Sequence, residues 1–288
     1  MTKTVLSTSS VTEYLRCHLR YKMSHLWRLR GEQNLPAAIG QAVHAGIEWE
    51  HRLNADLAGL VELSAEDALQ ATFDLEVASV PAADLAADPD GLADALTMLN
   101  VYRREVMPTF HPTMVEQPFT FALDDVIVSG TIDAADETTD DLRDLKTTAG
   151  KTINGRKPHF DPKNYHLQMS LYDMGYEALT GRRPRRSFLD VLTRRGTYRQ
   201  YEMIPNRHEA ADILGVVKSG LDAGDFEPTG ALSGACHWCA YKHSCSYAKR
   251  SRCKGEWNDT QHRIRVGTRV RATTALTVGT DDPQTDGR

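Results

Sequence analysis

The sequence lacks any long apolar run, and no stretch approaches the roughly 20 residues that a membrane-spanning helix requires. Its first ten residues, MTKTVLSTSS, also lack the extended apolar segment of a secretory signal. We therefore expect a cytoplasmic protein with no membrane partner. The formal net charge of −5 argues against a uniformly basic, histone-like binder, although local basic patches can still bind nucleic acid.

Cysteine is scarce, and four of the five cysteines lie towards the C-terminal end. In a reducing compartment, clustered cysteines indicate metal binding or catalysis rather than disulfides. The spacing Cys236-x2-Cys239-x5-Cys245 is tight enough for three thiolates to share a metal, and two completions are open. Cys253 would make a local Zn²⁺ knuckle, whereas Cys17 would tie the N-terminal part of the chain to the C-terminal cluster.

Several catalytic motifs are missing as well. Neither a GxSxG nucleophile elbow nor an HExxH zinc motif occurs. The segment Gly150-Lys151-Thr152 resembles the end of a phosphate-binding P-loop, but Leu145 stands where that motif needs a glycine. We therefore exclude nucleotide hydrolysis by this chain alone.

The elements that are present suit one large domain or one domain plus additions. Apolar spacing and chain breakers predict helices over residues 7–30, 38–60, 64–80, 91–107, 164–179 and 206–223, and strands over 115–123, 126–133, 142–147, 187–193 and 197–203. The segment 256–288 has little apolar content, and we expect it to be disordered. There is no internal repeat.

An acidic centre stands out in residues 130–146, GTIDAADETTDDLRDLK. Asp133 ends one predicted strand, and Asp144 and Lys146 lie two residues apart in the next, so both point to the same face. If the strands form a hairpin, both aspartates and the lysine meet. Two carboxylates suit Mg²⁺ or Mn²⁺, and a nearby lysine can orient an attacking water. The alternative is that these acids cap turns.

Two upstream residues could complete this centre. His44, in GQAVHAGIEWE, lies on a helix that should pack over the sheet, and an imidazole ligand would favour Mn²⁺. Taken alone, it would be an ordinary helix histidine with one hydrogen bond. Glu116 begins a predicted strand and could also reach the site.

Two further groups of residues could contact nucleic acid. Gln168 and Tyr172 stand at i and i+4, on one helical face, and both side chains can reach a phosphate or a base edge. Seven arginines fall within residues 182–199, including Arg194 and Arg195, and could track phosphates. The competing interpretations are a core tyrosine with an exposed glutamine, and a solvated hairpin.

The order of these segments resembles a known family. GQAVHAGIE, GTID, DLK and QMSLY are similar to the successive motifs of the RecB-type branch of the PD-(D/E)xK nucleases. The early SVTEYLRCHLRYKM and the late CHWCAYKHSC resemble its iron–sulfur version, which includes CRISPR-associated exonucleases, nuclease domains of recombination helicase–nucleases, and phage relatives. The resemblance runs from about Ser9 to Cys245. One departure is His18, which stands where the family usually has proline.

The resemblance implies a restriction-endonuclease-like α/β (α+β) fold, with a mixed central sheet flanked by helices. The domain would span residues 1–255, with a catalytic core over about 38–204 and an iron–sulfur clasp formed by 9–30 and 232–253. Its implied site residues are the metal ligands His44, Asp133, Asp144 and the Leu145 carbonyl, the catalytic Lys146, the DNA-contacting Gln168 and Tyr172, and the 4Fe-4S ligands Cys17, Cys236, Cys239 and Cys245. Cys253 would then be free.

The activity that follows is that of a Mg²⁺- or Mn²⁺-dependent DNA exonuclease. It would cut single-stranded ends in recombination, repair or phage DNA metabolism, in the cytoplasm of a bacterium or a phage-infected host. The competing hypothesis is a non-catalytic DNA-binding or adaptor subunit of a recombination or CRISPR-type complex. DNA is the expected partner in both cases, together with recombination, repair or CRISPR-type proteins.

Overall fold

The computed structural model describes residues 3–54, 63–149, 160–231 and 235–250 of the 288-residue chain. The predictions for residues 150–152, for Cys253 and for the tail 256–288 lie outside these ranges. Within them, the structure contains no helix with the length and hydrophobicity of a membrane span.

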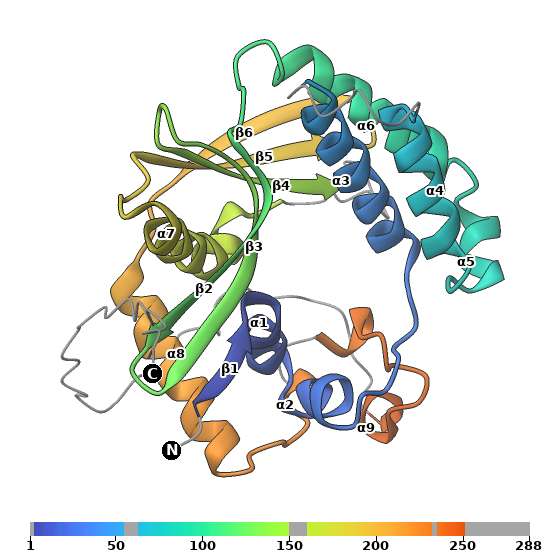
Figure 1. Ribbon diagram of the computed structural model, residues 1–288. Helices are drawn as coiled ribbons and strands as arrows, with labels where there is room; N and C mark the ends of the chain where they lie inside the picture. Colours follow the sequence, from blue (N-terminus) through green and yellow to red (C-terminus); the bar gives the residue numbers. More distant parts are fainter. Residues whose placement is uncertain (1–2, 55–62, 150–159, 232–234, 251–288) are drawn as a thin grey trace, which may run out of the picture.

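Six strands and several helices follow one another along the chain (Figure 1). The strands are β1 (Thr4–Ser7), β2 (Met114–Leu123), β3 (Val126–Asp136), β4 (Asp141–Thr148), β5 (Arg186–Thr193) and β6 (Thr197–Met203). The α-helices are α1 (Thr8–Arg16), α2 (His18–Tyr21), α3 (Leu35–Asn54), α4 (Ala65–Val77), α5 (Ala82–Ala87), α6 (Gly91–Glu105), α7 (His166–Thr180), α8 (Arg207–Asp222) and α9 (Ser246–Arg250). Shorter turns are η1 (Lys22–Leu26), η3 (Pro162–Tyr165), η4 (Thr229–Ala231) and η5 (Ala235–Trp238).

The strands form one mixed sheet in the order β1-β3-β4-β5-β6, with β2 also paired to β3. β2 runs antiparallel along nearly the whole of β3 and occupies one of its edges. The other edge is shared: β1 pairs in parallel with residues 126–129, and β4 pairs antiparallel with residues 134–136. β3 is therefore the strand on which the N-terminal and central parts of the sheet meet.

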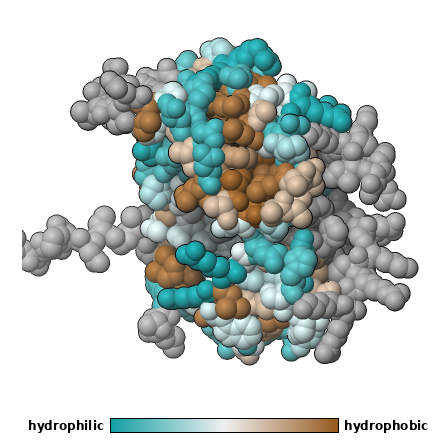
Figure 2. All heavy atoms as spheres, turned by 90° about the vertical axis from the view of Figure 1, so that its right-hand side faces the viewer, coloured by the Kyte–Doolittle hydropathy of each residue, from teal (hydrophilic) through white to brown (hydrophobic). Residues whose placement is uncertain are grey.

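Helices cover the two faces of this sheet and define two hydrophobic cores (Figure 1). One core joins α1, α7 and α8 to the sheet around Val11, Leu171 and Leu214. The other joins α3, α4 and α6 to the sheet around Ile39 and Leu99. Figure 2 shows apolar surface gathered over the helical layer on the right-hand side of Figure 1.

Two glycines allow α7 to approach the strands closely. A Cβ on Gly175 of α7 would lie 2.5 Å from the ring of Phe119, and a Cβ on Gly130 of β3 would lie 2.5 Å from the same ring. No real Cβ tolerates such contacts. The Phe119 ring therefore lies against both backbones, and it also meets the Tyr172 ring edge-on, with centroids 5.7 Å apart. This packing sets where α7 lies relative to β2 and β3.

The N-terminal segment differs from the single helix predicted over residues 7–30. Thr4–Ser7 forms β1, and α1 then begins with a capping box in which the Ser7 and Ser10 side chains bond each other's backbone N–H groups. Cys17 adopts an extended conformation (φ −166°, ψ 116°) and separates α1 from α2. The predicted segment is therefore helical in its first part, but Cys17 divides it into two helices, α1 and α2.

Candidate active site at the fork between β3 and β4

The site lies where two neighbouring strands separate. β3 and β4 pair only through residues 134–136 and 141–143. The next residues outward are Asp133 on β3 and Asp144 on β4. From there β4 continues along β5, with which it pairs over its whole length. The two aspartates predicted from the sequence therefore stand at the same point of the sheet, at the opening of the fork.

Asp133 bridges the fork with its side chain. Its Oδ2 accepts a hydrogen bond of 2.8 Å from the backbone N–H of Leu145. This bond stands where regular pairing between the two strands has ended. It holds the Asp133 carboxylate beside the peptide that links Asp144 to Leu145, and it fixes the orientation of that carboxylate.

Glu116 on β2 stands opposite Asp133 in the register of the two antiparallel strands. The residues on either side of this position are paired, but these two are not, and Glu116 has a φ of 46°. A left-handed conformation costs a non-glycine residue about 1–3 kcal/mol and is concentrated at functional sites. The strand is thus distorted where it presents a carboxylate.

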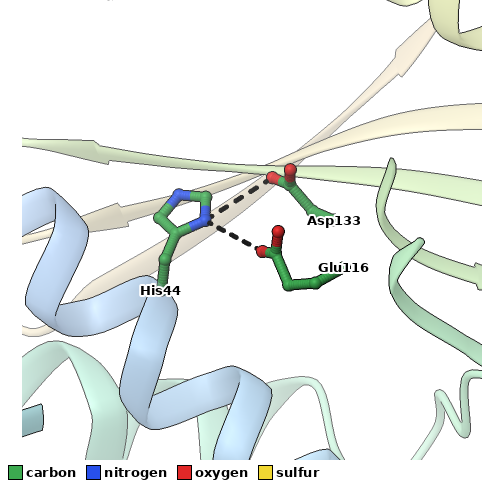
Figure 3. A group of neighbouring side chains, drawn as sticks. All are labelled: His44, Glu116 and Asp133. Atoms are coloured by element: carbon green, nitrogen blue, oxygen red, sulfur yellow. Dashed lines mark ion pairs between the residues drawn. The ribbon is translucent and has the colours of Figure 1, made fainter. Parts of the chain in front are cut away.

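His44 enters from α3 and faces both of these acids (Figure 3). Its Nδ1 lies 3.7 Å from Asp133 Oδ2 and 3.9 Å from Glu116 Oε1. Its Nε2 lies 3.1 Å from the Leu145 carbonyl oxygen. A proton on Nε2 would be donated to this carbonyl, which leaves the Nδ1 lone pair directed towards the carboxylates. Burial lowers the pKa of His44, but Asp133 and Glu116 outweigh it, so that the net shift is upward.

These three side chains fit a divalent cation. The donor atoms of His44, Glu116 and Asp133 all lie within 4.8 Å of one another. Ligands at about 2.1–2.2 Å from a common ion are separated by roughly 3–4.4 Å in an octahedral shell, so small side-chain movements suffice. Two carboxylates and one imidazole suit Mg²⁺ or Mn²⁺. Members of this set come from α3, β2 and β3, so the fold itself brings them together.

Asp144 and Lys146 form a pair beside this group. The Asp144 side chain is fully buried, and its Oδ2 lies 2.7 Å from Lys146 Nζ. Burial raises the pKa of Asp144 to about 7, against the opposing effect of Lys146. Burial lowers the pKa of Lys146, but the two aspartates outweigh it and raise it overall, so that the amine is an ammonium ion. Asp144 lies outside the three-donor group, and its role as a metal ligand stays a prediction.

Gln168 and Tyr172 of α7 lie next to this pair, and Gln168 contacts both Asp144 and Tyr172. Gln168 Nε2 donates to Asp144 Oδ1 at 2.9 Å and lies 3.0 Å from the Tyr172 hydroxyl oxygen. The predicted i, i+4 relation therefore holds, and it connects the helix to the fork. Tyr172 is largely buried. Of the two side chains, Gln168 is the one that forms a hydrogen bond with a residue of the fork.

The four cysteines grouped by the resemblance also gather. Cys17, Cys236, Cys239 and Cys245 line one pocket. A Cβ on Gly230 would lie 3.2 Å from Cys17 Sγ and 3.5 Å from Cys236 Sγ, so glycine leaves room between these two sulfurs. The break between α1 and α2 thus places Cys17 against the C-terminal segment.

The two arginines that were expected to bind DNA, Arg194 and Arg195, differ in their exposure. Arg194 is buried, and its guanidinium is ion-paired with Asp88 and Asp94 in the helical layer. Arg195 is exposed. Several neighbouring arginines also have acidic partners, among them Arg182 with Asp140, Arg183 with Glu177, and Arg186 with Asp141. Much of the charge of this arginine-rich segment is therefore neutralised within the protein.

Glu116 is the residue whose place the sequence described least well. Its carboxylate reaches the site because β2 and β3 pair in a register that sets it opposite Asp133. In the sequence, Glu116 and Asp133 are equally far from the connection between β2 and β3, and this predicts that they stand opposite each other. The prediction can be made only if these two strands are first assumed to form a hairpin.

We predict that Glu116→Gln weakens Mn²⁺ binding by about tenfold or more, because it removes a charged donor from the three-donor group. Isothermal titration calorimetry of the purified variant measures this. Glu105→Gln, at an exposed glutamate on α6, is the matched control and should bind Mn²⁺ like the parent. Equal affinity in Glu116→Gln and the parent would remove Glu116 from the metal site.

Comparison with known proteins places the chain in a family. The family model described as PD-(D/E)XK nuclease superfamily matches residues 5–246. The crystal structure of a "putative exonuclease" from Eubacterium rectale has a TM-score of 0.51 at 13% identity, covering 88% of this chain and 91% of that chain. The structure of SSO0001 is 14% identical and covers 80% of this chain and 95% of that chain, with a TM-score of 0.35. A search of curated proteins found no match.

The fold predicted from the sequence is therefore confirmed: a mixed central sheet flanked by helices, of the restriction-endonuclease-like class. The match covers most of the chain, including the fork and every side chain described around it. The chain belongs to the PD-(D/E)XK nuclease superfamily.

Proposed function

We propose that the chain is a DNA nuclease whose divalent metal is held at the fork by Asp133, His44 and Glu116, with Asp144 and Lys146 beside it. Family membership supports a hydrolytic nuclease that uses divalent metals and acts on DNA. The observation that carries the assignment of residues is the convergence of α3, β2, β3 and β4 on one point. A metal bound there would lower the pKa of its water and offset charge on the phosphate.

The protein's own side chains have distinct parts in this proposal. Lys146 carries a positive charge next to Asp144, so it can orient an attacking water and offset charge that develops on the phosphate. Gln168 holds the Asp144 carboxylate in place. Leu145 contributes its backbone, because its N–H fixes Asp133 and its carbonyl oxygen lies against His44.

The finer activity we propose is exonuclease action on single-stranded DNA ends, in recombination, repair or phage DNA metabolism. Support comes from the resemblance to the RecB-type motifs and from the Eubacterium rectale protein, which is described as a putative exonuclease. If the chain were a DNA-binding adaptor instead, it would bind DNA without cutting it.

We further propose a 4Fe-4S cluster at Cys17, Cys236, Cys239 and Cys245, forming a clasp between the N- and C-terminal parts. The four cysteines line one pocket, which brings residues distant in sequence to a single place. The resemblance to the iron–sulfur version of the family is the ground for proposing a cluster, and tetrahedral Zn²⁺ is the alternative.

Asp144→Asn and Lys146→Ala should each lower cleavage of single-stranded DNA at least about 100-fold in Mg²⁺ or Mn²⁺, because each removes a charge at the reacting phosphate. Gel-based cleavage of an end-labelled oligonucleotide measures the rate. Lys218→Ala and Asp222→Asn, which alter an acid–lysine pair on α8, are the matched controls. Undiminished cleavage in both fork variants would refute the site, and a parent that binds but never cuts DNA would favour the adaptor.

The purified protein should be brown and contain about four iron atoms per chain, as a 4Fe-4S cluster requires. Cys17→Ser should lose iron, whereas Cys253→Ser should keep it. Iron analysis and visible absorbance measure both. The ligand set is wrong if loss of Cys253 strips the iron while loss of Cys17 does not, and bound zinc in place of iron would favour the alternative metal.

A further inference from the structure

Tyr165 stands at the start of α7, in a turn that local contacts hold in place. It is the last residue of η3 and the N-cap of α7. The Asp161 side chain caps η3 by accepting a hydrogen bond of 3.0 Å from the Lys163 N–H, and Pro162 supplies a fixed φ at the first position of the turn. These contacts determine where the Tyr165 ring is presented.

The ring of Tyr165 lies against the ammonium group of Lys146. The distance from Lys146 Nζ to the ring centroid is 5.2 Å, within the range at which the face of an aromatic ring attracts a cation. The same Nζ lies 2.7 Å from Asp144 Oδ2. Burial raises the pKa of Tyr165, so the phenol is neutral and adds no second negative charge. The ammonium group is therefore held by one carboxylate and one ring.

Two further rings fix the position of Tyr165. Phe160 stacks on Tyr165 with ring centroids 5.4 Å apart and an angle of 15° between the planes. Phe160 also contacts Tyr201 of β6, with centroids 5.7 Å apart. All three rings are half-buried and pack against the core that joins α1, α7 and α8 to the sheet. The ring beside Lys146 is thus part of a packed row and not a loose side chain.

The first turn of α7 contacts both members of the acid–lysine pair. Tyr165 and Gln168 stand at i and i+3, which places them on the same side of the chain as it enters the helix. Gln168 donates to Asp144 Oδ1, whereas Tyr165 covers Lys146. A lysine ammonium group has three N–H donors on a flexible stem. With Asp144 on one side and the ring on another, the directions left to these donors are few.

We propose that Tyr165 is a positioning residue, whose ring directs the Lys146 ammonium group towards the phosphate or the attacking water at the fork. The inference rests on the proposed nuclease function and adds to it a residue that the sequence motifs did not single out. A ring restrains the ammonium group without neutralising it, so Lys146 keeps its charge for the transition state. A second carboxylate in the same place would cancel that charge.

Steady-state cleavage of an end-labelled single-stranded oligonucleotide tests this role. Tyr165→Leu should lower kcat about tenfold and leave KM nearly unchanged, because Lys146 loses its restraint while the groups that bind substrate remain. Tyr165→Phe keeps the ring and should keep most of the activity. Trifluorophenylalanine at position 165 keeps the shape of that ring but weakens the negative charge of its face, so its kcat should fall below that of Tyr165→Phe.

Phe73→Leu is the matched control, since Phe73 is a half-buried aromatic residue of α4 that packs against the other core. It should cleave like the parent. Circular dichroism checks that every variant keeps the helical content of the parent. Equal kcat in Tyr165→Leu and the parent would overturn the proposal. Equal kcat with phenylalanine and with its trifluoro form would also overturn it, because a ring that acts only by packing does not distinguish the two.

A second measurement follows the contact without hydrolysis. In lysine-labelled protein, the ring current of Tyr165 should displace the Cε–Hε NMR signal of Lys146, which is assigned by its absence in Lys146→Arg. This signal should move towards the usual lysine position in Tyr165→Leu. Lys22, whose Nζ lies over the rings of Trp27 and Phe226, should keep its signal in that variant. A Lys146 signal that does not move would overturn the proposal.

The two measurements separate this proposal from the nuclease proposal. A parent that cuts DNA while Tyr165→Leu is fully active would leave the nuclease standing and remove the role of Tyr165. A parent that cuts no DNA, with a Lys146 signal that still moves in Tyr165→Leu, would refute the nuclease and leave the restraint on Lys146 standing.

Discussion

The separation of β3 from β4 just beyond the Ala134–Arg143 pair is the constraint on which the rest of the site depends. Where two strands stay paired, backbone hydrogen bonds hold them about 4.8 Å apart and leave no room for side-chain chemistry between them. At the fork, the backbone hydrogen bonds between β3 and β4 end, and the Asp133 carboxylate instead accepts a hydrogen bond from the Leu145 N–H. That one bond keeps the strands close enough for His44, Glu116 and Lys146 to act on a common point.

The same constraint brings several ionisable side chains together at the fork, where they shift one another's pKa values. Asp144 is buried with a raised pKa, Lys146 is held as a cation against it, and the imidazole of His44 faces two acids. Burial disfavours each charge, but the nearby acids outweigh burial for His44 and Lys146, whereas Lys146 offsets only part of it for Asp144. A cation placed among these carboxylates would relieve their mutual repulsion. Perturbed groups of this kind concentrate at functional sites.

Local sequence patterns predicted part of this arrangement. The alternation in Asp144-Leu145-Lys146 predicted a buried Leu145 between two side chains on the other face, and the structure has Leu145 buried in the α3 core. What the patterns missed depends on contacts distant in sequence. The pairing of β1 with β3 and the break at Cys17 each need a partner that a local window does not contain. Arg194 was expected at the surface, but it is buried and ion-paired with Asp88 and Asp94. These two acids precede strands β2 to β4 in the sequence, so a local window around Arg194 does not contain them.

The most direct test of the central claim is crystallography of the protein soaked in Mn²⁺, with anomalous diffraction recorded to locate the metal. We expect a strong anomalous peak within about 2.2 Å of His44 Nδ1 and of carboxylate oxygens of Asp133 and Glu116, with Asp144 and Lys146 adjacent. An ordered Mn²⁺ bound elsewhere, with the fork empty, would contradict the account.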